Sequence, residues 1–234
     1  QALLNSLETH CAVDQEQVAH ALRYLSYYGY LAGARLSAGA SPGAWLAAMT
    51  GALTEFQLRA GLPDHGLLTP ETLDVMNRPR CGCRDVERLG LEEARWRKTS
   101  LTYTVAGYVN GLAQSEQDQI IDLAWRQWSD LAKFTITRSD KPDADITIST
   151  GRGQAQQFDG PSGTLAWAFL PTGRDTQLLM RFDLDEVWLA KGGSGIFLLN
   201  VACHEFGHLL GLEHSRVPSA LMALFYAAGI TKPQ

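Results

Sequence analysis

One segment near the C-terminal end leaves few structural choices. Three histidines, a glutamate and a glycine follow the pattern H-E-x-x-H-x-x-G-x-x-H, as His204, Glu205, His208, Gly211 and His214. A helix turns about 100° per residue, so His204 and His208 share a face, whereas a continuous helix would carry His214 about 240° further round. Glycine at 211 can take a positive φ and let the chain leave the helix, so that His214 reaches the same point. The pattern therefore predicts a metal site with three nitrogen ligands and one open position, which is typical of catalytic zinc.

The alternative is a buried amphipathic helix that carries histidines for unrelated reasons. The chain has six histidines, and the other three, His10, His20 and His65, all precede Cys81. Beyond Cys81, every histidine of the sequence belongs to the pattern. Five specified positions rarely coincide by chance, so the metal site is the favoured interpretation.

Length and charge bound the class of protein. A chain of 234 residues can bury one large core or two smaller ones. The net charge is −5, without a basic tract that would indicate nucleic acid or an anionic membrane, and no apolar run reaches the length of a membrane span.

Nothing at Gln1 resembles a signal peptide, so we expect any secretion signal to have been removed or to lie outside this chain. We expect the protein to be a monomer. Its four cysteines are too few for a fold that depends on a scaffold of disulfides.

The first 77 residues are predicted to form three helices. Apolar residues at helical spacing predict the first helix, namely Val18, Leu22, Leu25 and Tyr28. A second helix is expected over 45–60, and a third after Thr69, with Pro70 at the first helical position. The small residues of 32–44 indicate an exposed loop between the first two helices.

The pattern changes after a charged, irregular stretch at 78–98. Alternating or apolar segments predict strands at 101–105, 133–138, 145–150, 164–170 and 178–183. Ser115 with Asp118 is interpreted as a capping box for a helix that ends near Leu131, and the histidine helix is expected to start near Gly195. An early helix, a sheet and a final helix indicate an α/β (α+β) domain.

Further residues resemble a known family. Ser215 follows the third histidine, and Met222 lies eight residues after it, as in the Met-turn of metzincins. Residues 79–86, Pro-Arg-Cys-Gly-Cys-Arg-Asp-Val, are similar to the propeptide motif of matrix metalloproteinases (matrixins). Segments 24–31, 56–73, 96–103 and 158–161 also resemble that family. The resemblance implies a helical prodomain at 1–86, an activation linker at 87–95 and a zinc protease domain at 96–234. That domain would have a mixed, mostly parallel twisted sheet, a backing helix and an active-site helix.

The family resemblance implies that the protein is latent. Cys81 would be the fourth zinc ligand of a zymogen, held by a loop that Arg80 and Asp85 brace as an ion pair. Taken without its neighbours, Cys81 could equally be an ordinary free thiol. The family's proline is Arg84 here, and an additional cysteine, Cys83, follows Cys81. Cys83 is a spare thiol, a partner for Cys11 or a rival ligand, and the sequence leaves these three open.

The implied reaction is zinc-dependent hydrolysis of peptide bonds in proteins outside the cell, after the prodomain is removed. His204, His208 and His214 would hold the zinc, Glu205 would act as general base, and Met222 would form the floor of the site. Substrate would add as an antiparallel strand along 163–169. The residues expected to bind it are Leu165, Ala166, Leu224 and Tyr226. The loop at 32–44 would be the bait segment, and the final cleavage would fall within 86–96.

The family also implies further metal sites. Calcium is expected to bind carboxylates and backbone oxygens of Asp159, Gly160, Ser162, Thr164, Asp183 and Glu186, the alternative being a salt-bridged acidic loop without an ion. The positions of the family's second, structural zinc are Gly153, Ala155, Trp167 and Arg181 in this chain. None of these can bind zinc as required, so we predict that the structural zinc is absent.

Two other functions compete with this interpretation. Residues 50–76 also resemble helical peptidoglycan-binding modules, which would make the N-terminal unit a cell-wall anchor fused to a protease-like domain. An inactive, protease-like binding protein is the second alternative. The intact Glu205 and the three histidine ligands argue against it.

Overall fold

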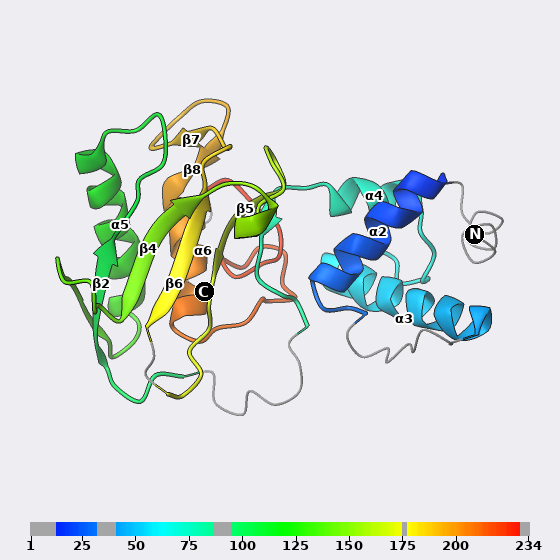
Figure 1. The fold of residues 1–234 in the computed structure, drawn as a ribbon, viewed down its shortest axis with the longest axis horizontal. Helices are drawn as coiled ribbons and strands as arrows, with labels where there is room; N and C mark the ends of the chain where they lie inside the picture. The colour runs from blue at the N-terminus through cyan, green and yellow to red at the C-terminus, as the bar shows by residue number, and fades with distance from the viewer. Residues whose placement is uncertain (1–12, 32–40, 87–94, 175–176, 230–234) are drawn as a thin grey trace. The chain divides into compact units, whose positions relative to one another are not determined.

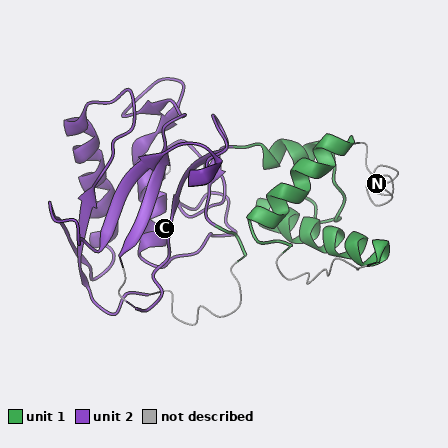
Figure 2. Ribbon diagram, viewed as in Figure 1, with its two compact units in different colours: residues 1–78, 84–90 green, residues 79–83, 91–234 purple. Residues whose placement is uncertain are grey.

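The computed structural model describes residues 13–31, 41–86, 95–174 and 177–229 of the chain. It divides into two compact units, coloured separately in Figure 2: residues 1–78 with 84–90, and residues 79–83 with 91–234. The predicted fold class, a helical segment followed by an α/β domain, is confirmed. Cys11, much of the predicted bait loop and most of the predicted cleavage segment lie outside the described residues.

In the described part of the first unit, the helices are α2 (Gln15–Tyr27), α3 (Pro42–Ala60) and α4 (Pro70–Met76) (Figure 1). Each follows a polar residue whose side chain accepts a hydrogen bond from a backbone N–H of the first turn: Asp14, Ser41 and Thr69. The predicted cap at Thr69 is thus confirmed. These caps satisfy backbone donors that the helices themselves leave without partners.

The core of the first unit is aromatic, with one buried amide at its centre. The rings of Tyr24 and Phe56 meet edge to face, with centroids 5.3 Å apart. Beside them Gln57 is fully buried; its Oε1 accepts from the Gly66 N–H at 2.8 Å, and its Nε2 donates to Thr72 Oγ1 at 3.0 Å. Because a buried amide must satisfy its hydrogen bonds, Gln57 joins α3 to the loop and helix that follow.

A six-stranded sheet, in the order β1-β5-β6-β4-β2-β3, forms the second unit. Its strands are β1 (Arg80–Cys81), β2 (Ser100–Val105), β3 (Thr135–Arg138), β4 (Ile146–Gly151), β5 (Thr164–Ala168) and β6 (Leu178–Asp183). Every neighbouring pair is parallel except β5 and β6, which are antiparallel. The mixed, mostly parallel sheet therefore agrees with the sequence prediction.

Two helices cover this sheet. Helices α5 (Gln114–Ser129) and α6 (Leu198–Leu209) pack against each other and share one apolar core with the strands (Figure 1). The rings of Trp125 on α5 and Phe206 on α6 stack with centroids 3.7 Å apart. Helix α6 begins three residues after the predicted Gly195, because Ile196–Phe197 form strand β8, which pairs with β7 (Trp188–Leu189). Among the described residues, no helix combines the length and apolar character needed to span a membrane.

The predicted capping box at the start of α5 is wrong. The helix begins at Gln114, and its N-cap, Ala113, makes no side-chain cap. The Asp118 carboxylate instead accepts a hydrogen bond from the Tyr108 hydroxyl at 2.8 Å and forms an ion pair with Arg138 at 2.8 Å. Local spacing favoured the box, but partners distant in the sequence bind the carboxylate more strongly.

The loop before α5 depends on Gln117. This side chain is nearly buried, accepts from the Val109 N–H at 2.8 Å, and donates to the carbonyls of Val109 and Leu112 at 2.9 Å each. We expect Gln117→Leu to lower the free energy of unfolding by about 3 kcal/mol, because it leaves these backbone groups buried without partners. Urea denaturation would measure the change.

The matched control is Gln119→Leu, the same change at an exposed position of α5. It should alter the free energy of unfolding by less than about 0.5 kcal/mol. Equal effects of the two substitutions would show that the Gln117 network does not hold the loop.

Candidate metal centre

Helix α6 presents the first part of the histidine pattern. His204 and His208 lie one turn apart on a buried face, and Glu205 between them is fully buried. The helix ends in a Schellman motif, in which the Gly211 N–H donates to the His208 carbonyl and the Leu212 N–H donates to the Gly207 carbonyl, both at 2.9 Å. Gly211 has a φ of 103°, as the sequence predicts. This left-handed residue turns the chain out of the helix axis.

The turn returns His214 to the other two histidines. His208 Nε2 lies 3.1 Å from His204 Nε2 and 3.2 Å from His214 Nε2. The spacing argument from the sequence is therefore consistent with the structure: a histidine that a straight helix would carry away joins the cluster once the chain bends at Gly211.

Backbone carbonyls determine which ring nitrogens can bind a cation. His204 Nδ1 lies 2.8 Å from the Leu221 carbonyl, and His208 Nδ1 lies 2.7 Å from the Leu212 carbonyl. A carbonyl can only accept, so each Nδ1 carries the proton, and each Nε2 keeps its lone pair. The two Nε2 lone pairs thus face each other at 3.1 Å, a repulsive arrangement that a cation between them would make favourable.

Cys81 completes the cluster from strand β1. Its Sγ lies 3.5 Å from His208 Nε2, and all four ligand atoms of Cys81 and the three histidines lie within 4.8 Å of one another. Zinc–nitrogen bonds of 2.0–2.1 Å and a zinc–sulfur bond of 2.3 Å at tetrahedral angles place nitrogens about 3.3 Å apart and sulfur about 3.6 Å from nitrogen. The observed spacings fit a tetrahedral zinc ion.

Burial controls the ionisation of the groups around the cluster. It raises the pKa of the Cys81 thiol well above the ordinary value, and it raises the pKa of Glu205 to about 8. Within the described residues, Glu205 Oε1 has no hydrogen-bond partner. Without a cation, this dry pocket favours the neutral thiol and the neutral carboxyl group. A bound cation would instead favour the ionised thiolate and carboxylate.

Three residues outside the histidine pattern make hydrogen bonds to α6 or to the loop that follows it. The Met222 carbonyl accepts from the Ser215 N–H at 2.7 Å, which closes the loop that also carries the Leu221 carbonyl. The indoles of Trp128 and Trp96 donate to the carbonyls of Cys203 and Leu209 at 2.8 and 2.7 Å. Sequence analysis did not identify these roles, because the acceptors are backbone carbonyls, which no residue type marks, and the tryptophan donors lie far away in the sequence.

Strand β5 offers the predicted substrate edge, and residues 79–82 lie along it. The Arg80 N–H donates to the Gly163 carbonyl at 3.0 Å, and the Gly82 N–H donates to the Ala166 carbonyl at 2.7 Å, so β1 runs parallel to β5. On the other side of β1, the Tyr226 N–H donates to the Pro79 carbonyl at 2.9 Å. The short strand therefore lies between β5 and the segment after Met222.

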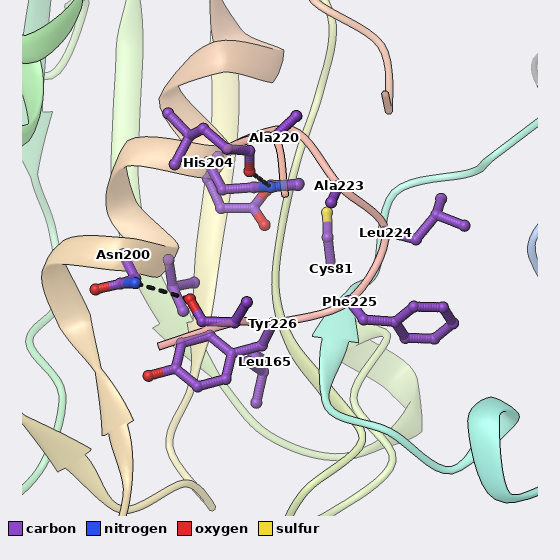
Figure 3. A pocket seen from close by; sticks show the side chains of 13 residues that line it. Cys81, Leu165, Asn200, His204, Ala220, Ala223, Leu224, Phe225 and Tyr226 are labelled. Carbon is purple, nitrogen blue, oxygen red and sulfur yellow. Dashed lines mark hydrogen bonds between the residues drawn. The ribbon is translucent and has the colours of Figure 1, made fainter. Parts of the chain in front are cut away.

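A pocket opens beside these strands (Figure 3). Its lining includes Leu165, Leu224 and Tyr226 of the predicted substrate site, together with Cys81 and His204, and the ring of Phe225 projects away from it. Ala166, the remaining predicted contact, is fully buried in β5. The lining also includes Asn200, one turn before His204, whose helical spacing could have indicated its place in the pocket.

The predicted calcium ligands lie close together around a loop. Asp159 Oδ1 accepts from the Thr164 N–H at 2.7 Å, and Glu186 Oε1 accepts from the Ser162 N–H at 2.6 Å. Asp183 is fully buried, and within the described residues its Oδ2 has no hydrogen-bond partner.

Burial, together with neighbouring negative charges that include Asp159, raises the pKa of Asp183 to about 6; the same causes raise the pKa of Glu186. In the described part of the chain, the clusters with three or more side-chain ligand atoms within 4.8 Å of one another contain only Cys81, Cys83, Glu205 and the three histidines. The acidic loop is thus a looser set of donors, which would close around an ion with help from backbone oxygens such as that of Gly160.

Two of the four positions of the family's structural zinc face each other across β5 and β6. Trp167 lies opposite Arg181, whose guanidinium carbon is 5.6 Å from the indole ring centroid. The indole N–H of Trp167 donates to the Gln156 carbonyl at 2.9 Å, which ties the loop containing Gly153 and Ala155 to the sheet. The absence of a structural zinc stays a prediction.

The two residues expected to brace the cysteine loop each make contacts within their own unit. Arg80 is nearly buried; its Nε donates to the Cys81 carbonyl at 3.0 Å, and its guanidinium carbon lies 5.5 Å from the Phe225 ring centroid. Within the first unit, Asp85 accepts from the Tyr30 hydroxyl at 2.6 Å. An Arg80–Asp85 pair stays a prediction.

Comparison with known proteins identifies the family. A profile of the matrixin family matches residues 95–233, and a profile of a putative peptidoglycan binding domain matches residues 14–76. The chain therefore belongs to the matrixin family, as the sequence motifs indicate.

Several curated matrix metalloproteinases are similar to most of the chain. It is 41% identical to human (Homo sapiens) matrix metalloproteinase-20 over 178 residues, which is 73% of this chain and 36% of that protein. It is 39% identical to matrilysin of Rattus norvegicus over 178 residues, 73% of this chain and 65% of that protein. It is 42% identical to interstitial collagenase of Equus caballus over 178 residues, 73% of this chain and 37% of that protein. The aligned part thus spans between about a third and two thirds of these relatives.

Metal analysis tests the centre directly. We expect one zinc per chain, and we expect His208→Gln to weaken zinc binding at least about 100-fold, since even outer-shell changes at zinc sites cost 10–100-fold. Competition with a chelator would measure the affinity. His65→Gln, in the first unit, is the control and should bind zinc like the original chain. Equal affinities for both variants would contradict the assignment of the centre. Two zincs per chain would contradict the predicted absence of the structural zinc.

Proposed function

We propose that this chain is the latent form of a secreted zinc endopeptidase, which hydrolyses peptide bonds in proteins after its helical prodomain is removed. The observation that carries the proposal is the histidine cluster, in which protonated Nδ1 atoms leave the Nε2 lone pairs of His204 and His208 facing each other. A bound cation relieves this arrangement, and the donor set of three imidazoles and one thiol suits zinc. Membership of the matrixin family supports the activity.

Zinc bound by His204, His208 and His214 would supply an activated water and polarise the scissile carbonyl. Glu205 is the proposed general base: it is buried beside the ligands, and its Oε1 has no hydrogen-bond partner among the described residues. This carboxylate would accept the proton of the attacking water and pass it to the leaving amine. Met222 is proposed to support the site from below, since its backbone closes the loop that positions Leu221.

Strand β5 is proposed to bind the substrate backbone. Its carbonyls at Gly163 and Ala166 accept hydrogen bonds from β1 in this structure, so they are oriented toward an added strand. A substrate would replace β1 there in the antiparallel direction. Leu165, Leu224 and Tyr226 would then line the pocket for the residue after the cleaved bond.

Latency is proposed to arise because residues 79–82 occupy that same edge while Cys81 fills the fourth ligand position. Three imidazoles and one thiolate complete a tetrahedron and exclude the reactive water. Removal of the prodomain would free the metal position and the substrate edge together.

Calcium is proposed to bind at the acidic loop. Support comes from the buried Asp183, whose Oδ2 has no hydrogen-bond partner in the described residues, and from the neighbouring charges of Asp159 and Glu186. A hard divalent cation would neutralise these carboxylates and satisfy the loop oxygens. Its role would be to stabilise the loop next to the start of β5.

Peptide cleavage before and after prodomain removal tests the proposed activity. The full chain should be nearly inactive, limited proteolysis should activate it, and Glu205→Gln should reduce kcat/KM by about 10²–10⁴-fold while zinc stays bound. Glu213→Gln, an exposed glutamate of the same pattern segment, is the matched control and should keep full activity. Full turnover by the Glu205 variant would exclude its role as base.

The peptidoglycan profile over 14–76 favours a second candidate, in which the helical unit anchors the chain to a cell wall. Sedimentation of the full chain with insoluble peptidoglycan separates the two functions. Retention on peptidoglycan combined with no latency would favour the anchor. A soluble chain that is activated by proteolysis favours the prodomain.

The pH dependence of stability tests the acidic loop. The pKa of Asp183 is about 6 in the folded protein, against an ordinary value of 3.8, so the folded state binds this proton more tightly than the unfolded state. Without calcium, the contribution of Asp183 to the free energy of unfolding should therefore fall as the pH rises from about 4 to about 6. Calcium should remove or reverse this dependence, because it favours the ionised carboxylate.

The variant Asp183→Asn should lack this component of the pH dependence and should not gain stability from calcium. Asp143→Asn, at an exposed position, is the control and should behave like the original chain. Thermal unfolding at several pH values, with calcium or with a calcium chelator, measures both. A calcium response that survives Asp183→Asn would place the ion elsewhere.

A further inference from the structure

A second thiol lies beside Cys81. Cys83 is 7% exposed, and its backbone N–H donates to Cys81 Sγ at 3.3 Å. The ligand atoms of Cys81, Cys83, Glu205 and His208 all lie within 4.8 Å of one another, so the two sulfur atoms are near neighbours. Neither cysteine takes part in a disulfide in this structure. The zinc cluster of three histidines and Cys81 does not require Cys83.

Cys83 makes its own contacts with the proposed active site. Its thiol donates to the Ala168 carbonyl at 3.1 Å and accepts from the Ala168 N–H at 3.3 Å. It also lies 3.9 Å from Glu205 Oε2. Cys83 therefore covers backbone groups at the end of β5 and one oxygen of the proposed general base.

The chain between the two thiols is suited to closing a disulfide. Strand β1 ends at Cys81, and the backbone bends at Cys83. Gly82 between them packs so closely on Thr164 that a larger residue would collide with it. The same glycine gives the backbone freedom to bring two cysteines, two residues apart, to the sulfur–sulfur bond length of about 2.05 Å.

We propose that Cys81 and Cys83 form a redox pair, whose oxidation to a disulfide activates the latent chain reversibly without cleavage. The inference rests on the proposed function of the zinc site. The oxidant is a small extracellular disulfide, RSSR. One cysteine thiolate attacks it, releases RS⁻ and forms a mixed disulfide, and the second thiolate then attacks the protein sulfur of that bond and releases the second RS⁻. In sum, two protein thiols and RSSR give the Cys81–Cys83 disulfide and two RSH.

The Cys81–Cys83 disulfide would remove two inhibitory contacts at once, that of Cys81 with the metal and that of Cys83 with Ala168 and Glu205. A disulfide sulfur is not a thiolate and cannot serve as the anionic metal ligand, so Cys81 would leave the histidine cluster. Cys83 would no longer bind the Ala168 backbone or cover Glu205. Because both thiols are nearly buried, the oxidation should be limited by how often residues 79–83 leave the site. Once formed, the disulfide would prevent Cys81 from returning, until a reductant breaks it.

The test uses the full chain carrying Cys11→Ser, loaded with Co²⁺ as a spectroscopic probe and incubated with glutathione disulfide. We expect the loss of two thiols, a Cys81–Cys83 linked peptide in mass spectrometry without reduction, and the loss of the sulfur-to-cobalt charge-transfer absorption. In the zinc-loaded chain, peptide cleavage should rise without any prodomain cleavage. Dithiothreitol should reverse all four changes.

Two variants serve as controls. Cys83→Ser should keep the charge-transfer absorption before oxidation and should not lose two thiols or gain reversible activity. Cys203→Ala removes a fully buried thiol in α6 and should oxidise like the original chain.

A mixed disulfide on Cys81 that persists without closing, equal oxidation of the Cys83→Ser variant, or a charge-transfer absorption that survives disulfide formation would overturn the inference. A chain that stays inactive after prodomain removal would instead overturn the proposed protease function. The thiol and cobalt measurements would still decide the redox pair in that case.

Discussion

The facing lone pairs of the histidine cluster are the constraint on which the rest of the second unit depends. Two imidazole Nε2 atoms 3.1 Å apart, both acceptors, are unfavourable in a buried pocket without a cation. The arrangement persists only because carbonyls hold the opposite side of each ring. Those carbonyls come from Leu212, after the Schellman turn, and from Leu221, before Met222. Both turns therefore help to orient the imidazole rings of the proposed metal site.

The same buried environment links the proposed chemistry to the proposed latency. Low polarity raises the pKa values of Glu205, Cys81 and Cys83, so each of these groups would remain neutral at moderate pH without a nearby cation. A bound zinc would reverse that preference, because it favours the ionised thiolate and carboxylate. Strand β1 pairs with β5 through ordinary sheet hydrogen bonds, and in the proposed latent form this pairing would cover the site.

The cysteine motif at 79–86 is divided between the two units. Residues 79–83 belong with the sheet, whereas Asp85 and Val86 donate their N–H groups to the Tyr28 carbonyl in the helical unit. The Tyr30 hydroxyl adds a bond to the Asp85 carboxylate. The motif thus ends in the helical unit and begins in the sheet unit.

Much of this protein could be predicted from its sequence, because the strongest signals are local. The spacing of His204, His208 and Gly211 specifies a helix, its end and two candidate ligands on one face. Helix caps such as Thr69 act within one turn. Strand positions also followed from short-range patterns. Predictions failed where a local pattern competed with distant partners: Asp118 binds Arg138 and Tyr108 instead of capping α5, and β8 pairs with β7 before α6 can begin.

What the sequence by itself determined is the chemistry: the donor atoms, their helical spacing and the membership of a protease family. Only the tertiary structure decided how the imidazole rings are oriented toward a metal. The carbonyls that orient the rings belong to the backbone, so no residue type in the sequence predicts them. It also decided the environment of Cys83, whose three possible roles the sequence left open. The Cys83 thiol lies beside Cys81 because β1 pairs with β5 and the chain then bends. The positions of the two cysteines in the sequence do not predict such long-range strand pairing.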